Sequence, residues 1–532
     1  MIKQKNIIAL IIIIFFIVSF LIPILTLFKM GFVNDGFTLE YLTATFNDAA
    51  FQNAMLASIF TSLATAIISL TLSLILVVFM KYTRINKLVK KIVEFLILLP
   101  MLLPSISFGF ALIYLFGNNG LLMNVFNTSI IDVYDYQGVI LGLVIYTIGP
   151  TYLMVNNSFN YLNGNLYYVS DILRNKKLDI MKSVIFPAIK SGLISSFFIA
   201  FTLSFTDYGI PMSLNYNTAS KYLYNITLGS YPNFSQGSIV AIFLLIVPLI
   251  IYIFVEIFIK KENSGEEITP LPVKKSLTRD IVTSFLTLCW LNVIIGMFAI
   301  IIIVPFVTSW PYDLSFSFDS WLRVLQKENV GRIIFNTARL ALLTVIFGTI
   351  LTFLSAYLVT KTNSKLNKII DTLSIIPNII PGMTLGLAYL LIAKNFDESS
   401  TIIFLVLINV VYFFTSPYLL FKNALERLNP NLEKTSIVFG YSWFKTLVKV
   451  IIPNLKNTLK EVVCYLIIHS FTTISAIVFI SSIATETLSL TIKRLEYFAD
   501  FRGIFTMSLV ILVINIIVVT FRDIKLKKIT NK

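Results

Sequence analysis

Apolar residues dominate this chain in repeated runs of about twenty residues, separated by short polar stretches. A helix of that length matches the hydrocarbon thickness of a bilayer. Twelve such runs predict an all-α membrane protein with twelve transmembrane helices. The predicted spans are residues 7–28, 54–80, 91–116, 138–160, 190–213, 237–259, 282–308, 336–360, 369–393, 401–422, 457–482 and 504–521.

One polar stretch, "KKENSGEEITPLPVKKSLTRD", divides the spans into two groups of six. It is charged and contains two prolines, which is typical of a linker. We therefore predict a first half at residues 1–260, a cytoplasmic linker at 261–280 and a second half at 281–532.

The two halves are predicted to be repeats. "LPMLLPSISFGFALIYL" (Leu99–Leu115) corresponds to "IPNIIPGMTLGLAYLLI" (Ile376–Ile392), each with two prolines four residues apart and a glycine five residues later. Proline interrupts helical hydrogen bonding, so both spans should kink or break there. An even number of spans per half gives both copies the same orientation, which predicts a parallel pseudo-twofold axis with a pathway between the halves.

A polar, amphipathic segment, "EKTSIVFGYSWFKTLVKVIIP", lies between the fourth and fifth spans of the second half, at Glu433–Pro453. Gly440 permits a sharp turn between two short helices, and Pro453 marks the entry to the next span. We predict a helix–turn–helix hairpin on the cytoplasmic side. Apolar residues recur with helical spacing on one face of its second helix. They are Phe444, Leu447, Val448 and Ile451.

Such a face could lie on lipid headgroups or dock in a groove of a soluble subunit. A second copy favours docking: "VSDILRNKKLDIMKSVIFP" ends at Pro187, and both Pro187 and Pro453 are followed by "SFT" seventeen residues later. Its helical stripe is Leu178, Met181 and Ile185. The two loops, at about residues 163–189 and 427–456, predict two equivalent cytoplasmic partners.

Composition and charge agree with this topology. Of the 532 residues, 57% are hydrophobic and only 13% are charged, and the net charge is +15. Lysine and arginine cluster in alternate loops, and residues 117–137 hold neither, as expected when positive loops stay cytoplasmic. Both termini are predicted to be cytoplasmic, and the positive charge needs no nucleic-acid partner. Cys289 and Cys464 lie within apolar runs, which predicts neither a disulfide nor a metal framework.

Candidate pathway residues follow the two "SFT" sequences, because polar groups are costly in lipid and tend to face a cavity. They are Thr206, Asp207 and Tyr208 in the first half, and Thr472, Thr473 and Ser475 in the second. A carboxylate suits an amine or a metal ion, whereas hydroxyls suit an oxyanion. Alternatively, Asp207 caps a local turn and the hydroxyls bond to the preceding helical turn.

The only histidine, His469, lies within the eleventh predicted span. A metal site needs several ligands, so a lone histidine does not predict one. We expect a hydrogen bond between helices, with pathway lining or a proton relay as alternatives. The chain has no G-x-x-x-x-G-K-[ST] loop, so ATP hydrolysis, if coupled to this protein, must belong to separate subunits.

The second loop resembles the E-A-A…G…P coupling loop of binding-protein-dependent ABC importer permeases, of the type I class. The matching positions are Glu433, Thr435, Ser436, Gly440 and Pro453. The first copy departs from the pattern: Tyr168, Val169 and Ser170 replace the acid and alanines, Arg174 replaces the glycine, and Pro187 remains.

Segments such as "SFTDYGIP", "SWPYDLSFSF" and "PGMTLGLAYL" resemble fused permeases of the iron(III) and 2-aminoethylphosphonate group. The resemblance implies two copies of an ABC ATPase subunit that use ATP, an extracytoplasmic solute-binding protein, no cofactor on this chain and a place in the cytoplasmic membrane. The preferred substrate is 2-aminoethylphosphonate, with iron(III), thiamine, a polyamine or another small solute as alternatives. A major-facilitator transporter and a membrane scaffold or insertase remain rival interpretations.

Overall fold

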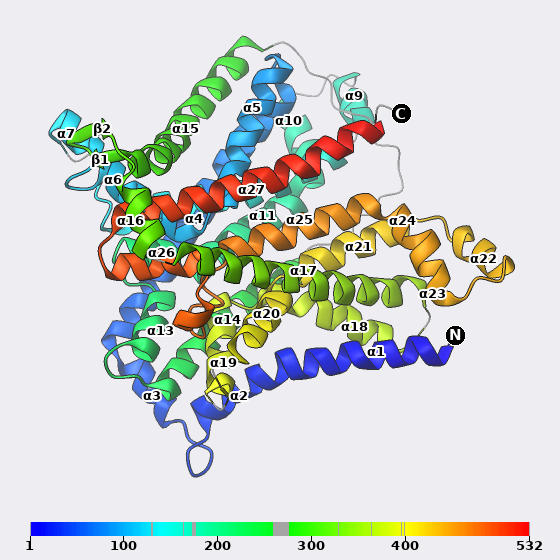
Figure 1. Ribbon diagram of the computed structural model, residues 1–532. Coiled ribbons are helices and arrows are strands. Elements are labelled where there is room, and N and C mark those ends of the chain that lie inside the picture. Colours follow the sequence, from blue (N-terminus) through cyan, green and yellow to red (C-terminus); the bar gives the residue numbers. More distant parts are fainter. Residues whose placement is uncertain are drawn as a thin grey trace.

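The computed structural model describes residues 2–128, 131–162, 164–172, 177–258, 276–327, 329–362, 364–394, 396–397 and 400–530. Within these residues, nine helices are long and apolar enough to cross a membrane, and two bent helix pairs would add two spans. Both chain ends lie at the same end of the molecule (Figure 1). The prediction of an all-α, multi-pass membrane protein is confirmed.

The long helices of the first half occur in the predicted order. They are α4 (Ala49–Tyr82), α5 (Lys87–Leu98), α6 (Ser105–Phe116), α8 (Tyr136–Ser158), α11 (Phe186–Thr206) and α14 (Phe234–Phe258). The corresponding helices of the second half are α17 (Val330–Lys361), α18 (Leu366–Ile375), α19 (Gly382–Ala393), α20 (Thr401–Tyr412), α21 (Thr415–Arg427), α25 (Lys456–Thr472) and α27 (Phe501–Thr530).

Two further membrane helices precede these groups. The first is α1 (Ile2–Phe16), which continues through one π-helical turn into α2 (Ile22–Phe32); the second is α15 (Leu277–Ile303). Short helices and one strand pair connect the spans: α3 (Glu40–Asn47), α7 (Leu121–Phe126), α12 (Gly209–Ser213), α13 (Ala219–Leu228), α16 (Asp319–Lys327), α26 (Leu488–Tyr497), and the antiparallel strands β1 (Val307–Ser309) and β2 (Asp313–Phe316).

Helix boundaries follow local chemistry. The Asp48 side chain accepts a hydrogen bond from the Ala50 amide at the start of α4, and Asp135 does the same for Tyr136 at the start of α8. Such caps satisfy amides that lack a helical partner. Two predicted spans end early: α11 stops at Thr206 rather than near residue 213, and α25 stops at Thr472 rather than near residue 482. After α11 the apolar run continues into the short helix α12 (Gly209–Ser213), and after α25 it continues as irregular chain.

The two proline-containing spans are broken as predicted. A 3₁₀ turn, Leu99–Leu102, separates α5 from α6, and the turn Ile376–Ile379 separates α18 from α19. Pro104 and Pro381 adopt extended backbone angles directly before α6 and α19. The second break bends its span by 104°. Each span therefore presents non-helical backbone at the interface between the halves, where lipid cannot reach it.

The two halves hold each other through these broken spans. The Ser107 hydroxyl of α6 lies 2.8 Å from that of Ser508 in α27, and the Asn515 amide of α27 donates to the Leu102 carbonyl at 2.8 Å. Equivalently, the Thr384 hydroxyl of α19 donates to the Ala241 carbonyl of α14 at 3.0 Å. Each half thus packs its broken span against the last helix of the other half.

The first helix of each half also packs on the opposite half. Helices α1 and α2 contact α17, α18 and α19, and Phe16 meets Phe414 edge to face at 4.8 Å (Figure 1). Helix α15 contacts α4, α5 and α6, with Phe108 and Phe298 6.2 Å apart. The first helix of each sequence half therefore lies against the other half, so the two halves are not separate units in space. Residues 261–275 of the predicted linker lie outside the described residues. Its last four positions, 277–280, belong to α15.

Gly386→Ala should destabilise the interface between α19 and the chain that follows α25. A Cβ atom at Gly386 would lie 2.7 Å from the Ala476 carbonyl oxygen and 2.9 Å from the Phe479 ring. Because a backbone atom would have to move, we expect a loss of about 1–3 kcal/mol, the usual cost of overpacking. Thermal unfolding of the purified chain measures this as a lower melting temperature.

Gly331→Ala is the matched control, because a Cβ atom there meets nothing within 4 Å. Equal melting temperatures for the two variants would show that the close approach at Gly386 is not a structural constraint.

Candidate functional site

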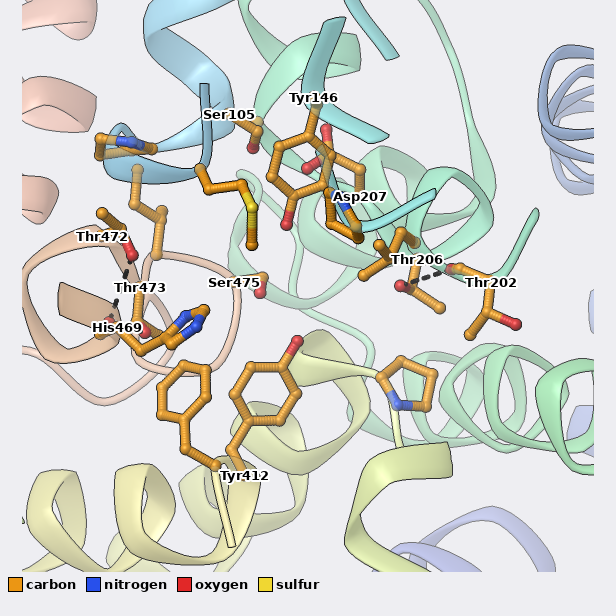
Figure 2. Close-up of a pocket in the computed structure, with 18 of the residues that line it drawn as sticks. Ser105, Tyr146, Thr202, Thr206, Asp207, Tyr412, His469, Thr472, Thr473 and Ser475 are labelled. Atoms are coloured by element: carbon orange, nitrogen blue, oxygen red, sulfur yellow. Dashed lines mark hydrogen bonds between the residues drawn. The ribbon is translucent and has the colours of Figure 1, made fainter. Parts of the chain in front are cut away.

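A cavity of about 220 Å³ lies between the two halves. Both proline breaks, both helix ends after the "SFT" sequences, and helices α8 and α20 contribute to its wall (Figure 2). The lining residues that carry a polar side chain are Ser105, Tyr146, Thr202, Thr206, Asp207, Asn378, Tyr412, Tyr465, His469, Thr472, Thr473 and Ser475. We call this the central cavity.

The helix ends beside the cavity are equivalent in the two halves. The chain leaves α11 at Asp207 and α25 at Thr473, with nearly identical extended backbone angles (φ −66°, ψ 135° and φ −68°, ψ 130°). The residues after each helix then cross the cavity wall instead of continuing through the membrane. Because of this crossing, polar groups that would sit at the outer end of an unbroken span lie inside the protein.

The structure brings five of the six predicted pathway residues to the central cavity. Tyr208 is the exception: it is fully buried outside the lining, against Tyr224 at 5.1 Å. The five that line the cavity are Thr206, Asp207, Thr472, Thr473 and Ser475. Their part in transport stays a prediction.

The hydrogen bonds of these residues match the alternative predicted from the sequence, in which the hydroxyls bond to the preceding helical turn and Asp207 caps a turn. The hydroxyls of Thr206, Thr472 and Thr473 donate to carbonyls of the preceding helical turn, at 2.8, 3.1 and 2.5 Å. One Asp207 oxygen accepts from the Ile210 amide at 2.9 Å and so caps the short helix α12. Asp207 therefore caps a turn and lines the cavity at once, since a carboxylate has acceptor positions to spare.

Sequence reasoning missed Tyr146, Tyr412 and Ser105 at this site. Tyr146 lies in α8 and Tyr412 ends α20, and their hydroxyls point into the cavity from opposite walls (Figure 2). Nothing in an apolar run marks which tyrosine will face a cavity, because the packing angle of the helices decides it. Ser105 directly follows Pro104. Its position beside a predicted helix break was the one sequence feature that could have indicated a place at the cavity.

His469 does not make the expected hydrogen bond between helices within the described part of the chain. Its ring stacks on Phe413, with centroids 4.8 Å apart, and packs against the tilted ring of Tyr465 at 4.2 Å, and it lines the central cavity (Figure 2). Two aromatic rings therefore hold the imidazole in place. The alternative of pathway lining describes its position better.

The charge of the central cavity is unbalanced. Asp207 is its carboxylate and His469 its only basic side chain, since no lysine or arginine occurs among the described residues that line it. Burial of a carboxylate without a cation is costly, which makes Asp207 a candidate functional residue.

A second cavity of about 700 Å³ adjoins the first. Met101, Tyr465 and His469 line both. Its wall also carries four ionisable side chains from helices α5, α25 and α27: Lys91, Glu94, Glu461 and Arg522. These segments lie towards the hairpin, on the side predicted to be cytoplasmic, and we call this space the inner cavity.

On the opposite side, helices α13 and α26 of the two halves approach each other (Figure 1). The Lys493 ammonium lies 2.6 Å from a Glu496 carboxylate oxygen and 5.5 Å from the centre of the Tyr224 ring. Burial raises the pKa of Glu496, and Lys493 and Lys221 oppose this rise. Burial lowers the pKa of Lys221. The ion pair lies within α26, and the contact of Lys493 with Tyr224 of α13 joins the halves at the end of the molecule away from the hairpin.

The predicted second-half hairpin is present. Helix α22 (Asn431–Val438) and helix α23 (Trp443–Thr446) flank Gly440, whose φ of +71° is the left-handed conformation that favours glycine. The Ser436 and Thr446 hydroxyls are 2.6 Å apart and close the hairpin. A π-helical segment, Leu447–Ile451, follows and leads through Pro453 into α25.

The predicted apolar stripe of the hairpin is divided. Phe444 is 69% exposed, whereas Leu447 is 4% exposed and Ile451 is fully buried. Helix α22 folds back on the Leu447–Ile451 segment, so Leu447 belongs to the interior of the hairpin. Leu447 is therefore covered in this conformation, and its contact with a partner stays a prediction. The most exposed apolar side chains lie at the tip: Val438, Phe439 and Phe444, which we call the hairpin tip. Val448 of the predicted stripe is 46% exposed.

Glu433 attaches the hairpin to the membrane helices. Its carboxylate accepts a hydrogen bond from the Tyr357 hydroxyl of α17 at 2.6 Å, and the Trp443 indole donates to the same hydroxyl at 3.1 Å. One buried tyrosine thus links both arms of the hairpin to α17. Thr435 lies on the exposed side of α22, and Ser436 is buried.

Tyr357→Phe should loosen the hairpin without unfolding the chain. The substitution removes two hydrogen bonds, each worth about 0.5–1.5 kcal/mol. Amide hydrogen exchange over residues 431–446 should accelerate about tenfold, while α17 keeps its protection. Tyr441→Phe is the control, because Tyr441 lies in the hairpin outside this network, with its ring under Lys445. Unchanged exchange in Tyr357→Phe would contradict the attachment.

The first-half loop is described only in part. Helix α9 (Gly164–Ile172) contains Ser170, and α10 (Lys177–Ile180) contains Leu178, followed by a π-helical segment, Met181–Ile185. Arg174 and the side chains of Ser170, Leu178 and Met181 lie outside the described part. Pro187 stands in the first turn of α11, as Pro453 stands in the first turn of α24 (Ile452–Asn454) in the second half.

Comparison with known proteins agrees with the repeat. Residues 74–263 and 345–531 each match the family described as the binding-protein-dependent transport system inner membrane component. The chain is 21% identical over 517 residues to a putative ferric transport system permease protein, FbpB 1, of Haemophilus influenzae, covering 92% of this chain and 79% of that protein.

Two further relatives differ in how much of the chain they match. The ferric transport system permease protein FbpB of Actinobacillus pleuropneumoniae is 20% identical over 540 residues, covering 97% of this chain and 77% of the relative. A probable sulfate transport system permease protein, cysT, of Helicosporidium is 23% identical over 257 residues. That match covers 47% of this chain and 92% of the relative, which has the length of one half.

Proposed function

The chain belongs to the family of inner membrane components of binding-protein-dependent transport systems, and on that premise we propose that it is the fused permease of an ATP-driven iron(III) importer. Membership in the family makes it a transport subunit rather than an enzyme. It also leaves the major-facilitator and scaffold interpretations without support.

We choose iron(III) as the cargo on the basis of the side chains that line the central cavity. A carboxylate, three tyrosine hydroxyls and several threonine and serine hydroxyls line it, and the described lining holds no lysine or arginine. Oxygen-rich, anionic surroundings suit a hard metal cation. The described lining offers no lysine or arginine to the phosphonate group of 2-aminoethylphosphonate, although the ammonium group of that molecule could pair with Asp207. The full-length relatives reported above are ferric permeases by name, and the comparisons give no support to 2-aminoethylphosphonate, our preferred substrate from the sequence.

Two ABC ATPase subunits are proposed to supply the energy, one at each cytoplasmic loop. The hairpin tip offers an exposed apolar surface of the kind that docks in a groove. Because Glu433 and Trp443 both bind Tyr357, a force on the hairpin would reach α17 directly. An extracytoplasmic binding protein would deliver the cargo at the α13 and α26 end.

The proposed transport cycle is alternating access. The central cavity borders the inner cavity, while Lys493 and Tyr224 bridge the halves on the outer side. This arrangement corresponds to an inward-facing state. Closure of the ATPase subunits would draw the two loops together, part α13 from α26 and open the central cavity to the binding protein.

A strain that lacks the gene for this chain tests the cargo. Under iron limitation it should grow poorly, and a plasmid copy should restore growth. With 2-aminoethylphosphonate as sole phosphorus source it should grow like its parent. Normal growth under iron limitation, in a strain without another iron importer, together with failure on the phosphonate, would overturn the proposal.

A further inference from the structure

We propose that Tyr146, Tyr412 and Asp207 form a transient iron(III)-binding site in the central cavity, an inference that rests on the proposed function. The three residues come from different elements: α8, α20 and the chain directly after α11. All three line the same cavity. Two of them belong to the first half and one to the second, so the site exists only where the halves meet.

The three side chains face one shared space. All of them line the central cavity, and each lies within electrostatic range of the other two. Figure 2 shows the hydroxyls of Tyr146 and Tyr412 pointing towards each other across the cavity, with Asp207 beside Tyr146 and Ser475 between the two walls. A ligand in that space would meet oxygen atoms from both halves at once.

These oxygens have capacity left for a ligand. The Tyr146 hydroxyl has no hydrogen-bond partner within the described part of the chain, although the residue is largely enclosed by protein. The Asp207 carboxylate accepts from the Ile210 amide and also interacts with the Ser105 side chain, and a carboxylate, with about four lone-pair sites, keeps acceptor positions beyond these two. The Tyr412 hydroxyl interacts with the Ser475 side chain and with the backbone of Gly382, at the start of α19, where partial positive charge favours an anionic oxygen.

Charge balance identifies the ligand class. Iron(III) is a hard, trivalent cation that prefers anionic oxygen donors. Binding would convert both phenols to phenolates, with the two protons released to water in the cavity, and the iron would stay ferric. Two phenolates and one carboxylate would together neutralise three positive charges. A single water needs only about 10–15 Å³, so a cavity of about 220 Å³ can hold the ion with several waters.

A third cavity tyrosine, Tyr465, provides an internal control. It lies four residues from His469 on α25, and its ring packs at a tilt against the His469 ring with centroids 4.2 Å apart. Its hydroxyl interacts with Ser416 of α21, so it is engaged outside the proposed site. Tyr465→Phe removes a phenol from the same cavity without removing a proposed ligand.

The test uses the purified full-length chain and iron(III) nitrilotriacetate as probe. Phenolate bound to iron(III) gives a charge-transfer band in the visible region, which neither the free probe nor unligated tyrosine produces. Wild type and Tyr465→Phe should develop the band. Tyr146→Phe and Tyr412→Phe should each lose at least half its intensity, and the double variant should lose all of it.

Transport by the complete complex separates failure of this site from failure of the proposed function. If wild type imports iron but shows no band, or if the double variant keeps the wild-type band, the site is wrong and the iron permease stands. If wild type imports no iron, the proposed function fails and the site fails with it. The double variant should melt within a few degrees of wild type, which checks that a lost band does not reflect unfolding.

Discussion

The double substitution Phe439→Asp, Phe444→Asp is expected to disrupt docking of an ATPase subunit at the second-half hairpin. Both side chains are exposed at the hairpin tip, and burial of one large apolar side chain contributes about 1.5–3 kcal/mol. Losing two such contributions, and burying two carboxylates instead, should weaken docking at least about a hundredfold, since each 1.4 kcal/mol is about tenfold. Substrate-stimulated ATP hydrolysis by the complex should fall to the basal rate.

Co-purification of the ATPase subunit with the tagged permease measures this effect. Phe498→Asp is the matched control: Phe498 is also an exposed aromatic residue, at the end of α26 on the opposite side of the molecule. It should leave co-purification unchanged. Full docking and full substrate-stimulated activity in the double variant would show that the hairpin tip is not the coupling surface.

Asp207→Asn is expected to reduce iron(III) transport at least tenfold while the chain still folds. Asparagine keeps an oxygen that can accept from the Ile210 amide, so the cap on α12 survives. The change removes the carboxylate from a cavity whose described lining holds no lysine or arginine. A tenfold loss corresponds to about 1.4 kcal/mol, which is modest for one charge acting on a cation in a site of low dielectric.

Asp132→Asn is the control for this substitution. Asp132 also accepts a backbone hydrogen bond, from the Tyr134 amide at 3.0 Å, but it is exposed and lies outside the central cavity. Its transport rate should equal that of wild type. Undiminished transport by Asp207→Asn would remove the electrostatic argument for a cationic cargo.

The features predicted well are those that a short stretch of backbone determines. Pro104 and Pro381 could not continue a helix, so both broken spans were foreseen from the sequence. Gly440 marked the hairpin turn for the same reason, because few other residues adopt its left-handed conformation readily. The equivalence of Asp207 and Thr473 followed from the repeat and holds in their backbone angles.

The features missed depend on how helices pack. Helical periodicity put Phe444 and Leu447 on one face, but α22 folds back and covers only Leu447. Tyr146 and Tyr412 lie in apolar runs, where every position is equally compatible with lipid, core or cavity. The packing of α8 and α20 against their neighbours places both tyrosines on the cavity side. No local pattern in a single sequence predicts which side of a helix that will be.

Uptake into proteoliposomes tests the central claim most directly. The vesicles would contain this chain with its ATPase subunits, and loaded binding protein would be supplied outside with either radiolabelled iron(III) or labelled 2-aminoethylphosphonate. The account predicts ATP-dependent accumulation of iron and none of the phosphonate. Accumulation of the phosphonate, with iron left outside, would contradict it.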